Sequence, residues 1–218
     1  MKFDSVIDRL QLALTQPLPG AAAHARMSPQ PRRPWPPGFN PARIRHAAGL
    51  LLVFPIEARA HVLLTVRSET LGRHSGQVSL PGGVAEPGET YEQAALREAH
   101  EEVGLDPASV RVIGALTPVD IPISGFRLHP IVAAAGHRPS LAPADEEVAR
   151  ILEADVLALC EPSTRIAITR DRGSGLTNVP AFRVDDADIW GATAMVLAEF
   201  LTLIGWRPNK KVVRPTFS

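Results

Sequence analysis

The stretch "LPGGVAEPGETYEQAALREAHEEVGLD", residues 80–106, decides the fold of this 218-residue chain. A loop rich in glycine and proline leads to Thr90, which is followed three residues later by Gln93 in the pattern of a helix capping box. Gly104 marks the other end, because glycine is the usual residue just past a helix. We therefore expect a helix from about Thr90 to Val103, directly after a glycine-rich loop.

Three glutamates fall on one side of this expected helix. Glu98, Glu101 and Glu102 are three and four residues apart, so their carboxylates would repel one another by a few tenths of a kcal/mol per pair. A divalent cation reverses that repulsion, and ligands that are all oxygen favour Mg²⁺ or Mn²⁺ over zinc. A solvated acidic helix face is the alternative. The glycine-rich loop favours the metal, because a backbone carbonyl, that of Gly83, can approach the same ion.

The spacing of these residues resembles a known family signature. Gly83, Glu89 and the run "REAHEEVGL" (Arg97 to Leu105) match the Nudix box at every fixed position. The resemblance implies an α/β protein with the Nudix fold, an α/β/α sandwich with a mixed sheet. It also implies hydrolysis of a nucleoside diphosphate linked to another group.

The resemblance assigns roles to individual residues. It implies that Glu98 and Glu102 bind the metal, with Glu101 as a further ligand or as the general base. Arg97 and Glu89 would form an orienting pair that holds the loop and the helix together; a structural role is favoured for both, and Arg97 is also a candidate catalytic residue. In relatives, a glutamate from a distal segment approaches the metal cluster, which makes Glu147 a secondary catalytic candidate; a solvated loop glutamate is the alternative.

A second signature points to a particular substrate. "LLTVRSETLGRHSGQVSLPGG" (Leu63 to Gly83) resembles the signature of the Nudix coenzyme A pyrophosphatases, as do Leu116 to Val132 and Ile189 to Ala194. It departs from that pattern at Leu80, where phenylalanine is usual, and at Gly72, where arginine is usual. The resemblance implies cleavage of coenzyme A or acyl-CoA to 3′,5′-ADP and 4′-phosphopantetheine or its acylated form.

The loop before the glycines supplies candidate substrate contacts. Arg67 and Arg73 suit phosphate, because a guanidinium donates two parallel hydrogen bonds. His74 fits a phosphate contact and a structural hydrogen bond equally well. Gly82 leaves room for a phosphate group, and Ser124 is expected in a wall of the pocket, with a plain connection between strands as the alternative.

Other functions remain open at this stage. One is a Nudix pyrophosphatase for ADP-ribose, a dinucleotide or a nucleoside triphosphate; another is a nucleotide-sensing module without hydrolysis. The 23 basic and 23 acidic residues give no global field for nucleic acid, and no apolar run approaches the ~20 residues of a membrane span. The single cysteine, Cys160, suits a reducing compartment, so we expect a cytoplasmic protein. A homodimer is left open.

The chain divides into three expected parts: an N-terminal helix and proline-rich arm at 1–44, a Nudix domain at 45–208, and a tail at 209–218. The segment 16–41 holds eight of the 21 prolines, so we expect no regular structure there. Apolar patterning predicts the following strands: 46–55, 60–67, 78–80, 110–116, 126–136, 147–152, 165–169 and 179–184. Besides the Thr90 helix, it predicts a short helix at 154–161 and a long one at 190–205.

Overall fold

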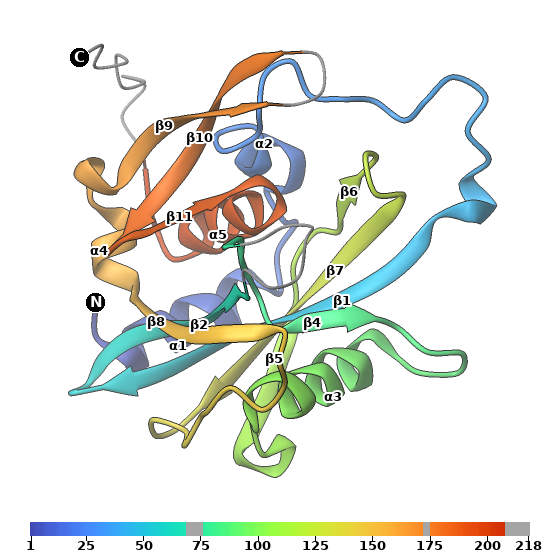
Figure 1. Ribbon diagram of the computed structural model, residues 1–218. Helices are drawn as coiled ribbons and strands as arrows, with labels where there is room; N and C mark the ends of the chain where they lie inside the picture. The colour runs from blue at the N-terminus through green and yellow to red at the C-terminus, as the bar shows by residue number, and fades with distance from the viewer. Residues whose placement is uncertain (69–75, 172–174, 208–218) are drawn as a thin grey trace.

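The fold of this computed structural model is described over residues 1–68, 76–171 and 175–207 (Figure 1). Its helices are α1 (Phe3–Ala13), α2 (Gly20–His24), α3 (Tyr91–Val103), α4 (Val156–Cys160) and α5 (Gly191–Leu203), with 3-10 turns at Pro41–Arg43, Pro107–Ser109 and Pro162–Thr164. Its strands are β1 (Arg45–Ile56), β2 (Arg59–Arg67), β3 (Val78–Ser79), β4 (Gly82–Val84), β5 (Val110–Ala115), β6 (Val119–Ile121), β7 (Phe126–Ala135), β8 (Val148–Asp155), β9 (Arg165–Asp171), β10 (Leu176–Val184) and β11 (Ala187–Trp190). No helix within these ranges is long and apolar enough to cross a membrane.

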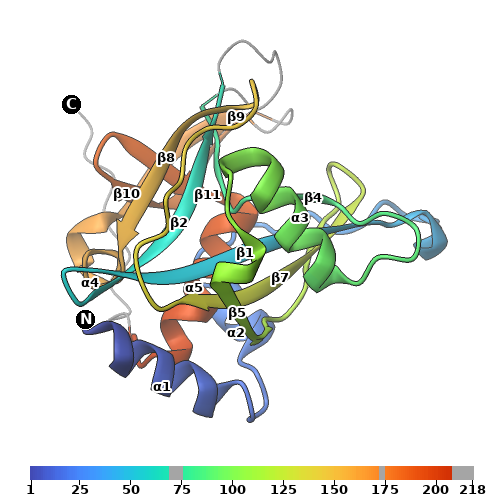
Figure 2. The same ribbon diagram turned by 90° about the horizontal axis from the view of Figure 1, so that it is seen from below.

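Eight of the described strands form one mixed sheet. Strands β3, β2, β1, β7 and β5 lie side by side in that order, and β4, β6 and β8 pair with β1, β7 and β2 respectively. The β1–β7 pair is parallel, with Arg45 opposite Phe126 and Val53 opposite Ala134, whereas the other pairs are antiparallel. Helix α3 covers one face of this sheet, and α1 and α5 cover the other (Figure 2). The expected α/β/α sandwich with a mixed sheet is confirmed.

The sequence of β1 is continuously apolar because both faces of this strand are buried. Leu51 and Val53 pack into the core that α1 and α5 share, whereas Leu50 and Leu52 pack against α3 on the opposite face. All four side chains are fully buried. A strand that is buried on both faces loses the polar alternation of a half-exposed strand, so β1 is apolar at every position of its centre.

A second, three-stranded antiparallel sheet was not expected as a unit. It has the order β11–β10–β9, and Phe182 and Ile189 from it pack into the same core as α5. Trp190 is the last residue of β11, directly before α5 begins at Gly191. A four-residue strand is too short to show a recognisable alternation in the sequence. Strand β11 is defined by its pairing with β10 instead.

The proline-rich arm is more ordered than its composition suggests. Helix α2 lies within it, so the expectation of no regular structure in segment 16–41 is wrong. The fully buried carboxylate of Glu199 in α5 accepts hydrogen bonds from the Gly20 backbone N–H (3.0 Å) and the Thr117 hydroxyl (2.7 Å), and it lies 2.9 Å from Nε2 of His24. A contact with a residue 175 positions away therefore fixes this segment, which local composition could not indicate.

Candidate active site

Helix α3 has the ends that the sequence predicts. The Thr90 hydroxyl accepts the Gln93 backbone N–H (3.2 Å), and the Gln93 side chain accepts the Thr90 N–H (2.9 Å), so the capping box is present. Gly104 ends the helix with φ of 68°, a left-handed conformation that glycine adopts without steric cost. Ala95, Ala99 and Val103 pack against the sheet. The glutamates therefore lie on the side of the helix that is close to the preceding loop.

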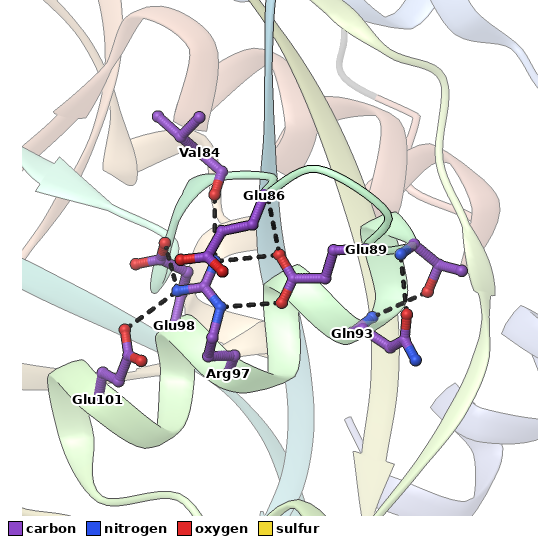
Figure 3. Close-up of polar contacts among 8 residues, drawn as sticks. Val84, Glu86, Glu89, Gln93, Arg97, Glu98 and Glu101 are labelled. Carbon is purple, nitrogen blue, oxygen red and sulfur yellow. Dashed lines mark hydrogen bonds and ion pairs between the residues drawn. The ribbon is translucent and has the colours of Figure 1, made fainter.

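Arg97 is the centre of an ion-pair network on this helix (Figure 3). It donates to Glu89 through Nε (2.8 Å) and Nη2 (3.1 Å), and to the Val84 carbonyl through Nη2 (3.1 Å). Its Nη1 donates to Glu98 (2.9 Å) and to Glu101 (3.1 Å). These contacts raise the pKa of Arg97 and, with the Glu86 N–H, hold the pKa of Glu89 below its ordinary value. The expected Arg97–Glu89 pair therefore forms and ties the loop to the helix.

Glu98 lies against the glycine loop. A Cβ atom on Gly83 would come within 2.4 Å of the Glu98 carboxylate, a distance that no real side chain tolerates. A Cβ on Gly82 would come within 2.2 Å of the Ala48 carbonyl oxygen, because β4 pairs closely with β1 there. Packing against backbone therefore requires glycine at Gly82, whereas at Gly83 the flexible Glu98 carboxylate would have to move aside. Because Gly83 has no side chain, the Glu98 carboxylate lies directly against the backbone of the loop.

Glu102 is the most perturbed acid of the site. It accepts a long hydrogen bond from the Gly82 backbone N–H (3.4 Å). Burial raises the pKa of Glu102 to about 8, and the neighbouring charges of Glu98, Asp145 and Glu147 act in the same direction. Burial also raises the pKa of Glu98, although the hydrogen bond from Arg97 offsets part of that effect. The two carboxylates flank Gly82 and Gly83 in surroundings that disfavour their negative charge.

Such an arrangement fits a hard divalent cation. The donor atoms are carboxylate oxygens, and a cation beside Glu98 and Glu102 would cancel the repulsion and desolvation that raise their pKa values. The expected set of three glutamates is only partly assembled, since the described residues contain no group of three acidic, histidine or cysteine side chains arranged around one point. Arg97 lies between Glu98 and Glu101, and the Glu101 side chain is 55 % exposed.

A distal segment lies beside this site, and a catalytic role for Glu147 within it stays a prediction. The Glu102 backbone carbonyl accepts the Ala144 N–H (2.9 Å), and the Glu147 carboxylate lies 2.9 Å from Nη1 of Arg67 at the end of β2. Asp145 was not among the predicted site residues; its carboxylate accepts the backbone N–H of Glu147 (2.9 Å) and of Val148 (3.1 Å). An aspartate that accepts the N–H groups two and three residues later is a recognisable turn pattern, so the signal was present.

The remaining substrate candidates are less closely placed. Arg73 and His74 lie outside the described residues. Ser124 lies in the turn between β6 and β7, where its hydroxyl donates to the Ile121 carbonyl (3.2 Å) and its own carbonyl accepts from Arg45 (2.8 Å). This turn precedes the residues of β7 that pair with the start of β1. A role for Ser124 in binding stays a prediction.

A cluster at the N-terminal end of α3 was also missed. The Tyr91 ring stacks on the His129 ring with centroids 3.6 Å apart, and Nδ1 of His46 lies 2.8 Å from Nε2 of His129 and 3.1 Å from the Tyr91 hydroxyl. Burial, together with the charges of His46 and Arg127, lowers the pKa of His129 to about 4. These rings join the start of α3 to β1 and β7, three segments that are far apart in the sequence.

Comparison with known proteins places this geometry in context. The NUDIX domain model matches residues 44–172. Among curated proteins, "Uncharacterized Nudix hydrolase NudL" of Yersinia enterocolitica is 36% identical over 171 residues, covering 77% of this chain and 85% of its own length. The protein of the same name from Citrobacter koseri is 34% identical over 165 residues, covering 75% of this chain and 85% of its own length.

One solved structure is similar over most of the chain. It is a Nudix hydrolase from M. smegmatis, RenU, with a TM-score of 0.55 and 24% sequence identity, and the match covers 78% of this chain and 91% of that one. At this level of identity the likeness concerns the fold alone. The same arrangement of a mixed sheet between helices is thus found in a protein of distant sequence.

Proposed function

The chain belongs to the Nudix hydrolase family, and on that premise we propose that it hydrolyses the pyrophosphate bond of coenzyme A or acyl-CoA. The family accounts for hydrolysis of a nucleoside diphosphate derivative. The finer assignment is supported by the position of Arg67. This residue of the coenzyme A signature ends β2 and pairs with Glu147, whose charge acts on Glu102 of α3. Arg67 of the coenzyme A signature therefore lies close to the acidic residues of α3.

The chain's own residues would hold the cation and the substrate. Glu98, Glu102 and the Gly83 carbonyl are proposed as ligands of Mg²⁺ or Mn²⁺, with Glu101 as a further ligand once Arg97 releases it. When bound, such an ion neutralises the pyrophosphate oxygens and makes a neighbouring water more acidic. Arg97 and Glu89 keep the glycine loop against α3, so that Gly83 stays beside Glu98.

Arg67 and Glu147 are proposed to exchange partners during the reaction. In the free protein Nη1 of Arg67 is bound to Oε2 of Glu147 at 2.9 Å. A substrate phosphate competes for the same guanidinium, because a phosphate dianion presents more negative charge than one carboxylate. The released Oε2 of Glu147 then accepts a proton from the attacking water as general base. Glu101 is the alternative base, and the pH profiles of Glu147→Gln and Glu101→Gln variants distinguish the two.

Product analysis tests the substrate assignment. Mass spectrometry after incubation with CoA, an acyl-CoA, ADP-ribose, NADH and dGTP in the presence of Mg²⁺ or Mn²⁺ should show 3′,5′-ADP and 4′-phosphopantetheine as the favoured products. Faster cleavage of ADP-ribose, NADH or dGTP would replace coenzyme A with that substrate. If none of the five compounds is cleaved, the chain is a nucleotide-sensing module. Full activity in excess chelator would refute the proposed metal site.

A comparison of two substrates tests Arg67. If Arg67 contacts the 3′-phosphate, the enzyme should prefer CoA to 3′-dephospho-CoA by about 10- to 100-fold in kcat/KM, since a charge-assisted hydrogen bond contributes ~1.5–3 kcal/mol. Arg67→Ala should remove most of that preference, whereas Arg43→Ala, at an exposed arginine in the 3-10 turn just before β1, should keep it. Equal rates on both substrates in the wild type would show that this loop does not recognise the 3′-phosphate.

The proposal extends to the setting of the enzyme. We place it in the cytoplasm, where its single cysteine stays reduced. Burial raises the pKa of the Cys160 thiol, which makes it a weak nucleophile. Light scattering on the purified chain tests whether it forms a homodimer.

A further inference from the structure

A groove lies on the side of the molecule formed by the N-terminal segments and the end of α5. It has a volume of about 590 Å³, and its lining includes Arg9, Leu12, Pro17, Arg26, Leu203 and Arg207. None of these residues lies within the segment 44–172 that the family model matches. The groove therefore belongs to the parts of this chain that surround the Nudix domain.

Three arginines give the groove its charge. Each is held in place through Nη1: Arg9 donates to the Ile204 carbonyl (2.6 Å), Arg26 to the Thr202 hydroxyl (2.8 Å), and Arg207 to the Thr202 carbonyl (3.3 Å). Among the described residues, no carboxylate forms a salt bridge with any of the three, and the lining contains no acidic side chain. Their charges are thus positioned by neutral acceptors and are not cancelled by acids.

The end of helix α5 offsets only a small part of this charge. A helix C-terminus carries roughly half of one negative charge, so three guanidinium groups leave a net charge of about +2.5. A phosphate monoester carries roughly −1.5 to −2 near neutral pH, which matches this value better than a single carboxylate does. The guanidinium fork also has the geometry that phosphate oxygens accept.

The floor of the groove is apolar. Leu12 is 70 % exposed, although it lies on a helix whose opposite face is fully buried at Val6 and Leu10. Pro17 and Leu203 continue the same surface. A ligand that uses both halves of the groove needs an anionic head and an apolar body.

We propose that this groove binds a small phosphate ester that carries an apolar chain. The phosphate lies among Arg9, Arg26 and Arg207, and the chain lies over Leu12 and Pro17. This site is separate from the acidic residues of α3 and does not depend on the reaction that they carry out.

Calorimetric titration with octyl phosphate, octanoate and inorganic phosphate tests the site. The full chain is titrated at constant ionic strength and below the critical micelle concentration of octyl phosphate. EDTA is present so that the metal-free glutamates of α3 repel anions, which disfavours binding of the ligand at the active site. Octyl phosphate should bind more tightly than either of the other two compounds. Equal affinity for octanoate would refute the phosphate assignment, and equal affinity for inorganic phosphate would refute the apolar half of the site. Failure of octyl phosphate to bind would refute the proposal as a whole.

Variants locate the binding. Arg26→Gln and Arg207→Gln should each weaken octyl phosphate binding by about tenfold, whereas Arg43→Gln, at an exposed arginine outside the groove, should leave it unchanged. Leu12→Gln should weaken binding of octyl phosphate but not of inorganic phosphate. If Arg67→Ala abolishes binding, the ligand occupies the active site and the proposal is wrong. Arg9 is left intact because it caps the end of α5.

Discussion

Replacing Glu102 with glutamine should change how the stability of the metal-free protein depends on pH. Burial raises the pKa of Glu102 from an ordinary value of 4.5 to about 8. Between these values the folded protein keeps a proton that the unfolded chain has lost. The free energy of unfolding of the wild type should therefore fall as pH rises from 4.5 to 8, and level off above 8. Glutamine has no proton to lose, so the variant should lack this component.

The size of the effect follows from the two pKa values. The difference, 8 − 4.5 = 3.5, corresponds to a ceiling of about 5 kcal/mol, since one pKa unit is ~1.36 kcal/mol. Glu102 is only partly buried, and water screens part of the neighbouring charge of Glu98 and Glu147. We therefore expect the wild type to lose about 2 kcal/mol relative to the variant over this range.

Urea unfolding in EDTA at pH 5, 6, 7, 8 and 9 measures this difference. The metal-free variant should be the more stable protein at pH 9. Saturating Mg²⁺ should reverse the order, because the cation stabilises only the wild-type carboxylate, and its binding at pH 7 should release close to one proton per Glu102. Parallel stability curves for wild type and variant, with and without Mg²⁺, would show that Glu102 neither holds the proton nor meets the cation.

Three further changes probe the helix, the loop and the arm. Glu98→Gln should lower kcat at least 100-fold without unfolding the protein, while Glu92→Gln, an exposed residue of the same helix, should leave steady-state kinetics unchanged. Gly83→Ala should lower kcat more than tenfold with a small change in melting temperature, because the new methyl group meets the Glu98 carboxylate; unchanged kcat would contradict the close contact. Glu199→Gln should destabilise the protein by about 2–4 kcal/mol in urea unfolding, since the amide places N–H groups against the donors of Gly20 and Thr117.

Local signals in the sequence were sufficient to predict the elements that form the candidate site. Thr90, Gln93 and Gly104 fix the ends of α3 through contacts within the helix itself, so no knowledge of the remaining chain is needed. The apolar run of β1 likewise reports burial on both faces. For the same reason the spacing of Glu98 and Glu102 could be interpreted directly, because it depends only on helical geometry.

Contacts between distant segments were beyond the reach of the sequence. Helix α2 depends on Glu199, which in the sequence is one polar residue in a long apolar helix. The ring cluster at the start of α3 requires that β1 and β7 be parallel neighbours, which brings His46 and His129 together. Strand β11 exists only through its register with β10. In each case the information lies in pairing, and no local pattern carries it.

Contacts seen only in the structure also separate the two candidate metal ligands, Glu98 and Glu102, which sequence spacing alone does not distinguish. Arg97 donates to Glu98 directly and thereby compensates part of its charge in the absence of a cation. Glu102 has a weak backbone donor and three acidic neighbours instead, so its charge has no compensating cation within the described chain. We therefore expect Glu102 to be the residue whose ionisation is coupled to metal binding. Glu98, held by Arg97 and enclosed by Gly83, should define where the ion lies. Loss of Glu98 should then weaken Mg²⁺ binding at every pH, whereas loss of Glu102 should also remove most of the pH dependence of that binding.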